Sequence, residues 1–560
     1  MKRILKYLAA TSLVSVSTIA ISACTSSERE NAAPKAKPPI ASVAELGRRI
    51  ERLSSDDFEG RAPATPGGQA ASQYIADEMK AAGLLPMGEN GSYFQSVELT
   101  EATVRADSNM TLTSGGTPLI NADQKSNAVY WTKRLDPTVN IENSDIVFVG
   151  YGVVAPEYGW NDYDGIDVKG KTVVMLVNDP GFATKDEALF KGNAMTYYGR
   201  WTYKFEEAGR QGAAAALIVH QTEPASYGWD VVSGSWTGAQ YDLVRPDGGA
   251  SRTALEGWLS LEAAQSLFKA SGQDFGTAAK SAVSKNFKPI AMNGVKLNAT
   301  IHQDVKTTES RNVAGGVIGT ERPDEYVLYM AHWDHLGKNE SLEGDQIYNG
   351  AVDNATGTAS IIEIGEAFVE QGAPKRSAIF VAVTAEESGL LGSAYYAEDP
   401  LVPLENTVAG INIDAILPVG RTKDMIVVGY GASELEDKLT AILDPRDMYI
   451  VPDPNPQAGY YYRSDHISLA KKGVPMLYAD SGNQHVTNGL EYGEAFAKEY
   501  TKERYHKPSD EYDNSWDLSG IAQTTEILFE LGYGMANEDT WVNWYEGTEF
   551  RALRDAMRNK

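Results

Sequence analysis

The nine residues YVLYMAHWD, numbers 326–334, decide the fold. Tyr326 to Ala331 form a short apolar run that predicts a buried strand, and His332, Trp333 and Asp334 follow at its carboxyl end. Comparable apolar runs occur at 378–384, 408–413, 425–428 and 475–478, with helical patterns near 357–370 and 433–443. Because apolar strands separated by helices are typical of a parallel sheet covered on both faces, we expect an α/β fold with a mixed, largely parallel sheet sandwiched by helices.

The rest of the chain suggests a divided main domain. At about 150 residues per domain, 560 residues correspond to roughly two to four domains. The segments YDGIDVKGK (163–171) and EAGRQGAA (207–214) each precede a short apolar strand and resemble the protease-associated domain, a β-rich module often inserted into exopeptidases. The resemblance implies a peptidase domain in two parts, 42–110 and 305–560, around an insertion at 111–304. An unrelated β-rich insertion is the alternative.

The N-terminal residues are typical of a secreted lipoprotein. Residues 1–24, MKRILKYLAATSLVSVSTIAISAC, place a basic start before a stretch too short and too rich in Ser and Thr to span a bilayer well. The ending ISAC resembles the bacterial lipobox, which implies a signal peptide at 1–23, lipidation of Cys24 and a flexible tether at 24–41. Thr25 favours sorting to the outer membrane of the cell envelope, facing the periplasm or the exterior. A plain signal peptide with an incidental cysteine is the alternative.

The composition excludes several classes of function. Lys and Arg total 50 against 76 Asp and Glu, a net charge of −26, and we expect no nucleic-acid partner because so acidic a surface repels phosphate backbones. The single cysteine excludes internal disulfide bonds and thiolate metal cages. A metal site must therefore be built from His, Asp and Glu. Among the seven histidines, His335 and His485 are expected to be surface groups, with lining of the cleft as the alternative.

Acidic residues and a histidine collect at the predicted strand ends. Glu386 and Glu387 follow one strand, Asp414 follows the next, and a loop with Asp353 lies between the first two strands. The carboxyl ends of parallel strands meet at one edge of a sheet, so these side chains are expected to converge with His332. This much negative charge without an arginine partner is costly unless a cation neutralises it. The sequence therefore predicts a metal centre at this edge.

Six motifs follow one another along the chain. They are His332-x-Asp334, Gly350-x-x-Asp353-Asn354-x-x-Gly357, Glu386-Glu387-x-Gly389-x-x-Gly392-Ser393, Asn412-x-Asp414, Ser464-Asp465-His466 and Tyr505-His506-x-Pro508-x-Asp510. Together they resemble family M28 of metallopeptidases, the zinc aminopeptidase and glutamate carboxypeptidase group, over residues 42–110 and 305–535. The resemblance implies the zinc exopeptidase fold and two Zn²⁺ ions bridged by Asp353. One ion would also take His332 and Asp414, and the other Glu387 and His506, while Asp334 would hydrogen-bond the far nitrogen of His332.

The chemistry of the residues supports these implied roles. Asp353 stands in a glycine-flanked loop, where its carboxylate can approach two ions. Adjacent side chains of an extended chain alternate in direction, so Glu387 can bind metal while Glu386 stays free as the general base, the role that the family assigns to it. Tyr505, beside a ligand, is a candidate donor to the oxyanion, with simple packing as the alternative. His466 is expected to line the substrate pocket or to lie just behind it.

The resulting prediction is a membrane-anchored di-zinc aminopeptidase acting on peptides. The acidic loop at 338–345 and the acidic chain as a whole favour cationic amino termini. Arg463, Arg504 and Lys507 stand beside motif residues and could instead clamp a substrate carboxylate, which keeps a glutamate-releasing carboxypeptidase open as the alternative. A glutaminyl cyclase with one zinc ion and a non-catalytic binding protein on the same fold are the remaining alternatives.

Overall fold

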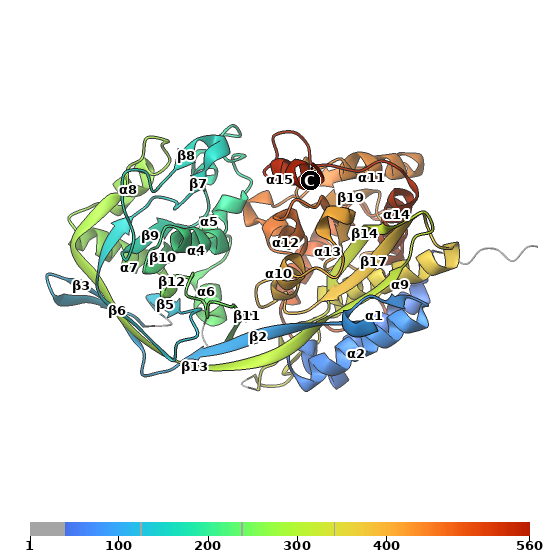
Figure 1. Cartoon of the computed structure of the whole chain (residues 1–560), viewed down its shortest axis with the longest axis horizontal. Helices are drawn as coiled ribbons and strands as arrows, with labels where there is room; N and C mark the ends of the chain where they lie inside the picture. Colours follow the sequence, from blue (N-terminus) through green and yellow to red (C-terminus); the bar gives the residue numbers. More distant parts are fainter. Residues whose placement is uncertain (1–39, 124–125, 237–238, 341, 560) are drawn as a thin grey trace, which may run out of the picture. The chain divides into compact units, whose positions relative to one another are not determined.

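A computed structural model of the chain describes residues 40–123, 126–236, 239–340 and 342–559, which belong to one compact unit, Ile40–Lys560 (Figure 1). The predicted signal peptide at 1–23 and the lipidation site Cys24 lie outside the described residues, and so does the tether at 24–41 up to residue 39. Among the helices of the described ranges, none has the length and apolar character needed to cross a membrane.

The predicted main sheet is present and is centred on the strand quoted first. The strand order is β13 (Ile290–Val317), β17 (Arg376–Val383), β14 (Arg322–His332), β18 (Thr407–Asn412), β21 (Met476–Ser481), β19 (Asp424–Val427) and β20 (Tyr449–Pro452). Strands β17, β14, β18 and β21 run parallel to one another, β13 is antiparallel to β17, and β19 is antiparallel to β21. The sheet is therefore mixed and largely parallel, as predicted.

Helices cover both faces of this sheet, as the apolar strands require. Val327 and Tyr329 of β14 pack in one hydrophobic cluster, whereas Leu328 and Met330 pack in another on the opposite face. The first cluster is closed by α1 (Val43–Leu53), α2 (Pro66–Ala81), α9 (Gly357–Gln371), α11 (Leu435–Leu443) and α14 (Ser519–Asn537). The second is closed by α10 (Leu391–Glu398), α12 (His466–Ala470) and α15 (Arg551–Arg558). The predicted α/β class is confirmed.

The predicted insertion contains a second sheet with its own apolar packing. Its elements are β3 (Asn109–Ser114), β4 (Thr117–Asn121), β5 (Ala128–Trp131), β6 (Thr138–Phe148), β9 (Thr172–Leu176), α4 (Trp201–Arg210), β10 (Ala215–Val219), α6 (Trp229–Ser235), β12 (Leu255–Leu259), α7 (Leu261–Ala270) and α8 (Phe275–Ser281). Two hydrophobic clusters between Met110 and Ile301 hold it together. The long strand β13 pairs with β6 here and with β17 of the main sheet, so it crosses the predicted boundary at 304/305. The boundaries and the protease-associated assignment stay predictions.

Arg61 ties the N-terminal segment to the carboxyl edge of the main sheet. Its side chain is 1% exposed and donates hydrogen bonds to the carbonyl oxygens of Leu53 at 2.7 Å, Trp333 at 2.9 Å and Gly350 at 2.9 Å. A guanidinium fork can serve several carbonyls at once, which a lysine cannot do in the same geometry. The loops after β14 and before α9 are thereby fixed against each other, and these loops carry the residues considered next.

Candidate metal centre and active site

The predicted site residues converge at the carboxyl edge of the main sheet. His332 is the last residue of β14, and Asp414 stands two residues after β18. Glu386 and Glu387 follow β17, and Asp353 lies in the segment Ala351–Thr356 that leads into α9. Parallel strands with helices between them bring their carboxyl ends, and the side chains that follow, to one rim.

Two groups of metal-binding side chains share Asp353. His332 Nε2 lies 3.1 Å from Asp414 Oδ1 and 3.2 Å from Asp353 Oδ1. On the other side, His506 Nε2 lies 3.2 Å from Asp353 Oδ2 and 3.2 Å from Glu387 Oε2. The two oxygens of one carboxylate thus face two different imidazoles, the arrangement expected of a bridging ligand. All five side chains predicted as metal ligands are brought together.

His335 is a correction to the sequence-based expectation. It was expected on the surface, but it is 1% exposed and its Nδ1 lies 2.7 Å from Glu387 Oε1. Its ligand atoms lie close enough to those of Asp353 and Glu387 for the three to hold an ion together. His335 follows β14 by only three residues, so the turn that directs Asp334 inward also buries this imidazole. His485, also expected on the surface, is 9% exposed and accepts hydrogen bonds from the backbone of a nearby turn.

Asp334 contacts His332 differently from the expectation. The carboxylate Oδ1 is 3.9 Å from His332 Nδ1, too far for a hydrogen bond, whereas the backbone carbonyl of Asp334 is 3.2 Å from that nitrogen. The carboxylate instead accepts the backbone N–H of Glu386 at 3.0 Å. Burial raises the pKa of Asp334 to about 7. A proton on Nδ1, shared with the carbonyl, leaves the Nε2 lone pair of His332 aimed at two carboxylates.

A bound cation would remove the repulsion between the Nε2 lone pair of His332 and the two carboxylates. The residues present can therefore be tested for their fit to zinc. A lone pair facing carboxylate oxygens at about 3 Å is repulsive unless a proton or a metal ion lies between them. Carboxylate oxygens and imidazole nitrogens are ligands that zinc accepts, and no thiolate is required. Although burial opposes it, contacts with His332 and His506 lower the pKa of Asp353 well below its usual value, so this carboxylate stays ionised. The residues present therefore fit two zinc ions.

Glu386 differs in environment from its neighbour. Within the described ranges its carboxylate has no hydrogen bond or ion pair, whereas Glu387 contacts two imidazoles. Burial raises the pKa of Glu386 well above its usual value, His332 opposes this, and the charges of Glu387 and Asp414 add to it. An uncommitted carboxyl with a raised pKa beside candidate metal ligands is what a general base requires.

The loop that carries Asp353 is fixed by another motif residue. The carboxylate of Asp510 accepts the backbone N–H of Val352 at 3.1 Å and that of Asp353 at 3.1 Å, and Tyr500 donates its hydroxyl to it at 3.3 Å. Together with Arg61 on the preceding residue Gly350, these bonds hold the bridging carboxylate in place. Such support of a ligand by surrounding groups is typical of metal centres.

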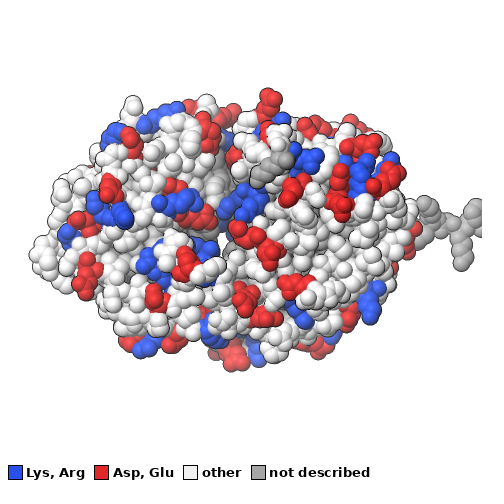
Figure 2. Space-filling model, viewed as in Figure 1, with Lys and Arg blue, Asp and Glu red and all other residues white. Residues whose placement is uncertain are grey.

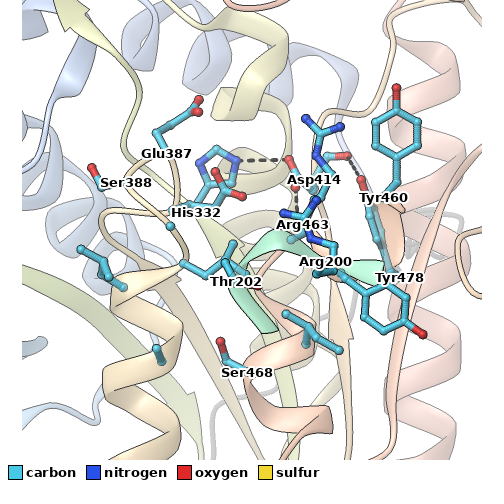
Figure 3. Close-up of a pocket in the computed structure, with 18 of the residues that line it drawn as sticks. Arg200, Thr202, His332, Glu387, Ser388, Asp414, Tyr460, Arg463, Ser468 and Tyr478 are labelled. Carbon is cyan, nitrogen blue, oxygen red and sulfur yellow. Dashed lines mark hydrogen bonds and ion pairs between the residues drawn. The ribbon is translucent and has the colours of Figure 1, made fainter. Parts of the chain in front are cut away.

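A cavity of about 940 Å³ opens over these residues, and its walls come from the main sheet with its loops and from the inserted region. His332, Glu387 and Asp414 line this cavity together with Arg463 and Arg200 (Figure 3). The inserted region supplies further lining residues: Lys133, Tyr197, Trp201, Thr202, Tyr227, Trp236 and Tyr241. Sequence reasoning missed this contribution, because no local motif marks it.

The two predicted substrate-binding residues are placed differently from each other. Tyr505 lines the cavity and stacks on His506 with ring centroids 3.9 Å apart, and burial keeps its pKa well above the usual value, so the phenol remains a donor. His466 is buried between Tyr461 and Tyr478, at centroid distances of 4.8 Å and 5.3 Å, and is not among the lining residues. It lies behind the wall and supports Tyr478 instead of facing the cavity.

Comparison with known proteins is consistent with this site. Residues 312–531 match Peptidase family M28, and this segment contains every residue of the two groups above. A glutamate carboxypeptidase 2 homolog of Caenorhabditis briggsae is 34% identical over 134 residues, and aminopeptidase NAALADL1 of Mus musculus is 36% identical over 127 residues. These matches span 23% and 22% of this chain but only 16% of either relative's length. The solved aminopeptidase from Aneurinibacillus sp. strain AM-1 is 17% identical, with 90% of this chain and 95% of that chain covered and a TM-score of 0.49.

Proposed function

We propose that the chain is a di-zinc exopeptidase that removes N-terminal residues from peptides. The observation that carries this proposal is the carboxylate of Asp353, whose two oxygens each lie 3.2 Å from a different imidazole. His332 and Asp414 would complete one metal site, and Glu387 with His506 the other. His335 is a further imidazole for the second site, since its Nδ1 lies 2.7 Å from Glu387.

The residues around the ions would divide the hydrolysis among them. When bound, a pair of divalent ions would supply Lewis acidity for the scissile carbonyl and a nucleophilic water at neutral pH. Glu386 accepts the proton of the attacking water and delivers it to the departing amine, so atoms and charge balance over the reaction. Tyr505, which lines the cavity, would donate its hydroxyl to the oxyanion of the tetrahedral intermediate.

A free carboxylate beside the metal centre favours an aminopeptidase. Glu386 lines the cavity without a cationic partner among the described residues, so the ammonium group of a peptide finds compensation there. The acidic loop at 338–345, on which the sequence argument relied, does not line the cavity. The support for a site that binds the substrate's α-amino group therefore comes from the cavity wall and not from that loop.

Two arginines on the same wall favour a second candidate, a carboxypeptidase. Arg200 and Arg463 line the cavity, and neither has an ion pair within the described residues. Burial, and then the charge of Arg463, lower the pKa of Arg200 to about 10, so the two cations lie near each other. Of the other cations expected there, Arg504 lies 3.6 Å from Glu499 and Lys507 donates to a backbone carbonyl on the surface. An Arg pair is suited to a substrate carboxylate.

Blocking either end of a dipeptide decides between the two. We expect that acetylating the amine of Leu-Ala abolishes cleavage, because the carboxylate of Glu386 then loses its ammonium partner. Amidating the carboxyl end should change kcat/KM less than about 10-fold, the effect of one charge-assisted contact. Hydrolysis is measured by amino-acid release with the zinc-loaded protein. The reverse pattern would transfer the assignment to the carboxypeptidase.

Membrane attachment is part of the same proposal, and the substrates are peptides outside the cytoplasm. The support is the ISAC ending at Cys24 and the polar residues behind it. The excess of acidic residues argues against nucleic acid, and Figure 2 shows acidic and basic side chains interspersed over the face in view.

Cys24→Ala in the full chain is therefore expected to move the protein from the detergent phase to the aqueous phase. The thiol is the only acceptor for a lipid of this kind in the chain. Detergent partition of cell extracts measures the change, and Thr25→Ser is the control that should stay in the detergent phase. A Cys24→Ala protein that remains there would remove the anchor from the proposal.

A further inference from the structure

Strands β19 and β21 of the main sheet contribute a carboxylate, an aromatic ring and an aliphatic side chain to the cavity wall. Strands β19 and β21 are antiparallel there, and Ile426 stands directly opposite Asp480. Opposed residues of an antiparallel pair project to the same face, and residues two apart on one strand do so as well. Tyr478 therefore shares that face with Asp480, and all three residues line the cavity together with Leu417 and Val428.

Asp480 is a carboxylate without a countercharge. Among the described residues no Lys, Arg or His lies within 4.0 Å of it, and its oxygen accepts one hydrogen bond, from the backbone N–H of Ser481 at 3.2 Å. Burial raises its pKa well above the usual value, and the charge of Asp414 adds to this. A half-buried carboxylate whose nearest charge is another carboxylate is unfavourable without a cation.

The position of Asp480 relates it to the reacting centre. Tyr478 directs its hydroxyl to the backbone carbonyl of Asp414 at 3.5 Å, which places this strand beside the first metal group (Figure 3). Asp480 stands two residues further along β21, about 7 Å at the usual rise per residue of a strand. The charge of Asp414 acts on Asp480, so a cationic group held at Asp480 would lie near the metal centre and would belong to the side chain of the residue whose carbonyl is attacked.

The rest of the wall restricts the kind of side chain. Ile426, Val428 and Leu417 are aliphatic and Tyr478 presents an aromatic ring, so Asp480 is the one charged residue among these five lining residues. Lysine and arginine match this combination, because a chain of methylene groups packs along apolar surface while the charged head reaches a polar partner. A leucine side chain would fill the apolar part and leave the carboxylate without its cation.

We propose that Asp480 makes this site selective for peptides that begin with lysine or arginine. The inference rests on the proposed aminopeptidase function and adds the class of the N-terminal side chain to it. The substrate's α-ammonium group is the competing partner for Asp480. An α-ammonium belongs to every peptide, so binding at that group would produce no preference among side chains.

The test compares 7-amino-4-methylcoumarin amides of Lys, Arg, Leu and Ala on the zinc-loaded full chain. We expect the wild-type protein to have a higher kcat/KM for Lys and Arg than for Leu and Ala. Asp480→Asn should lower kcat/KM for Lys and Arg by at least about 10-fold, the effect of a lost charge-assisted contact, and leave Leu and Ala within about 3-fold. Asp447→Asn is the matched control, since Asp447 is exposed, ahead of β20 and outside the cavity lining.

The outcomes separate the two levels of the proposal. A wild-type preference for Leu, or an equal loss on all four amides in Asp480→Asn, would overturn the assignment of Asp480 and leave the aminopeptidase standing. No cleavage of any amide by the wild-type protein would overturn the proposed function, and the assignment with it. The wild-type ranking needs no variant, so a misfolded Asp480→Asn protein does not prevent a decision.

Discussion

Glu386→Gln is expected to lower kcat by about 10²–10⁴-fold, the usual contribution of a general base, while both metal ions stay bound. Glutamine has nearly the same shape but cannot take the proton of the attacking water. The carboxylate of Glu386 makes no hydrogen bond or ion pair within the described residues, so the substitution removes no visible structural contact.

Kinetics and elemental analysis of the same preparation decide this prediction. Glu370→Gln is the matched control, since Glu370 is exposed on α9 and distant from the metal groups in sequence and in fold. It should keep the wild-type kcat and the wild-type zinc content. A Glu386→Gln protein with full zinc content and unchanged kcat would require another base, and one that lost zinc would show that Glu386 is a ligand.

The convergence of the ligands could be predicted from sequence because it follows from strand periodicity. His332, Asp414 and the Glu386-Glu387 pair each follow an apolar run, and parallel strands bring those positions to one rim whatever the loops do. The different roles of Glu386 and Glu387 were expected from the alternation of an extended chain, and the resemblance to family M28 decided which of the two is the base. In the structure both residues lie in a turn after Ala385, whose φ is 54°, and this turn separates their side chains.

Details that depend on a single turn or rotamer could not be predicted in this way. Asp334 was expected to bond His332 through its carboxylate, but the turn after β14 offers the backbone carbonyl instead. The same turn buries His335 against Glu387. Both outcomes depend on how residues 333–336 leave the strand, for which an apolar periodicity contains no information.

The contribution of the inserted region lies beyond sequence reasoning for a different reason. Arg200 reaches the cavity only because the segment before α4 contacts the main sheet's loops, where Met195 N–H donates to the carbonyl of Pro456 at 3.1 Å. Inside the insertion, Lys204 is fully buried and donates to the carbonyls of Tyr151 at 2.6 Å and Tyr198 at 3.1 Å, which fixes that segment. Contacts between residues more than 250 positions apart leave no local pattern.

Asp353→Ala is expected to bind at most one zinc ion per chain and to lose all measurable turnover. Without the bridging carboxylate, His332 and Asp414 remain on one side and His506 and Glu387 on the other, with His335 as a further donor on the second side. Zinc sites in proteins usually have at least three protein ligands, so the first side, with two, should empty first. The remaining carboxylates then repel one another, and the folded state loses the stabilisation that bound metal provides.

The two zinc sites should differ in how easily they lose their ion, and Asp353→Asn tests this difference. Asp353→Asn keeps the shape and one oxygen but not the charge, so it should retain at most one zinc ion per chain, on the side that contains Glu387, His335 and His506. Glu343→Ala is the control, because Glu343 is exposed on the loop between β14 and Asp353 and should keep two ions and the wild-type melting temperature. Zinc per chain is measured after gel filtration, and thermal unfolding with and without added zinc is measured beside it. In Asp353→Ala, added zinc should raise the melting temperature far less than in the wild type, because the carboxylate that joins the two sites is gone. Two tightly bound zinc ions in Asp353→Ala would show that other residues hold the metals.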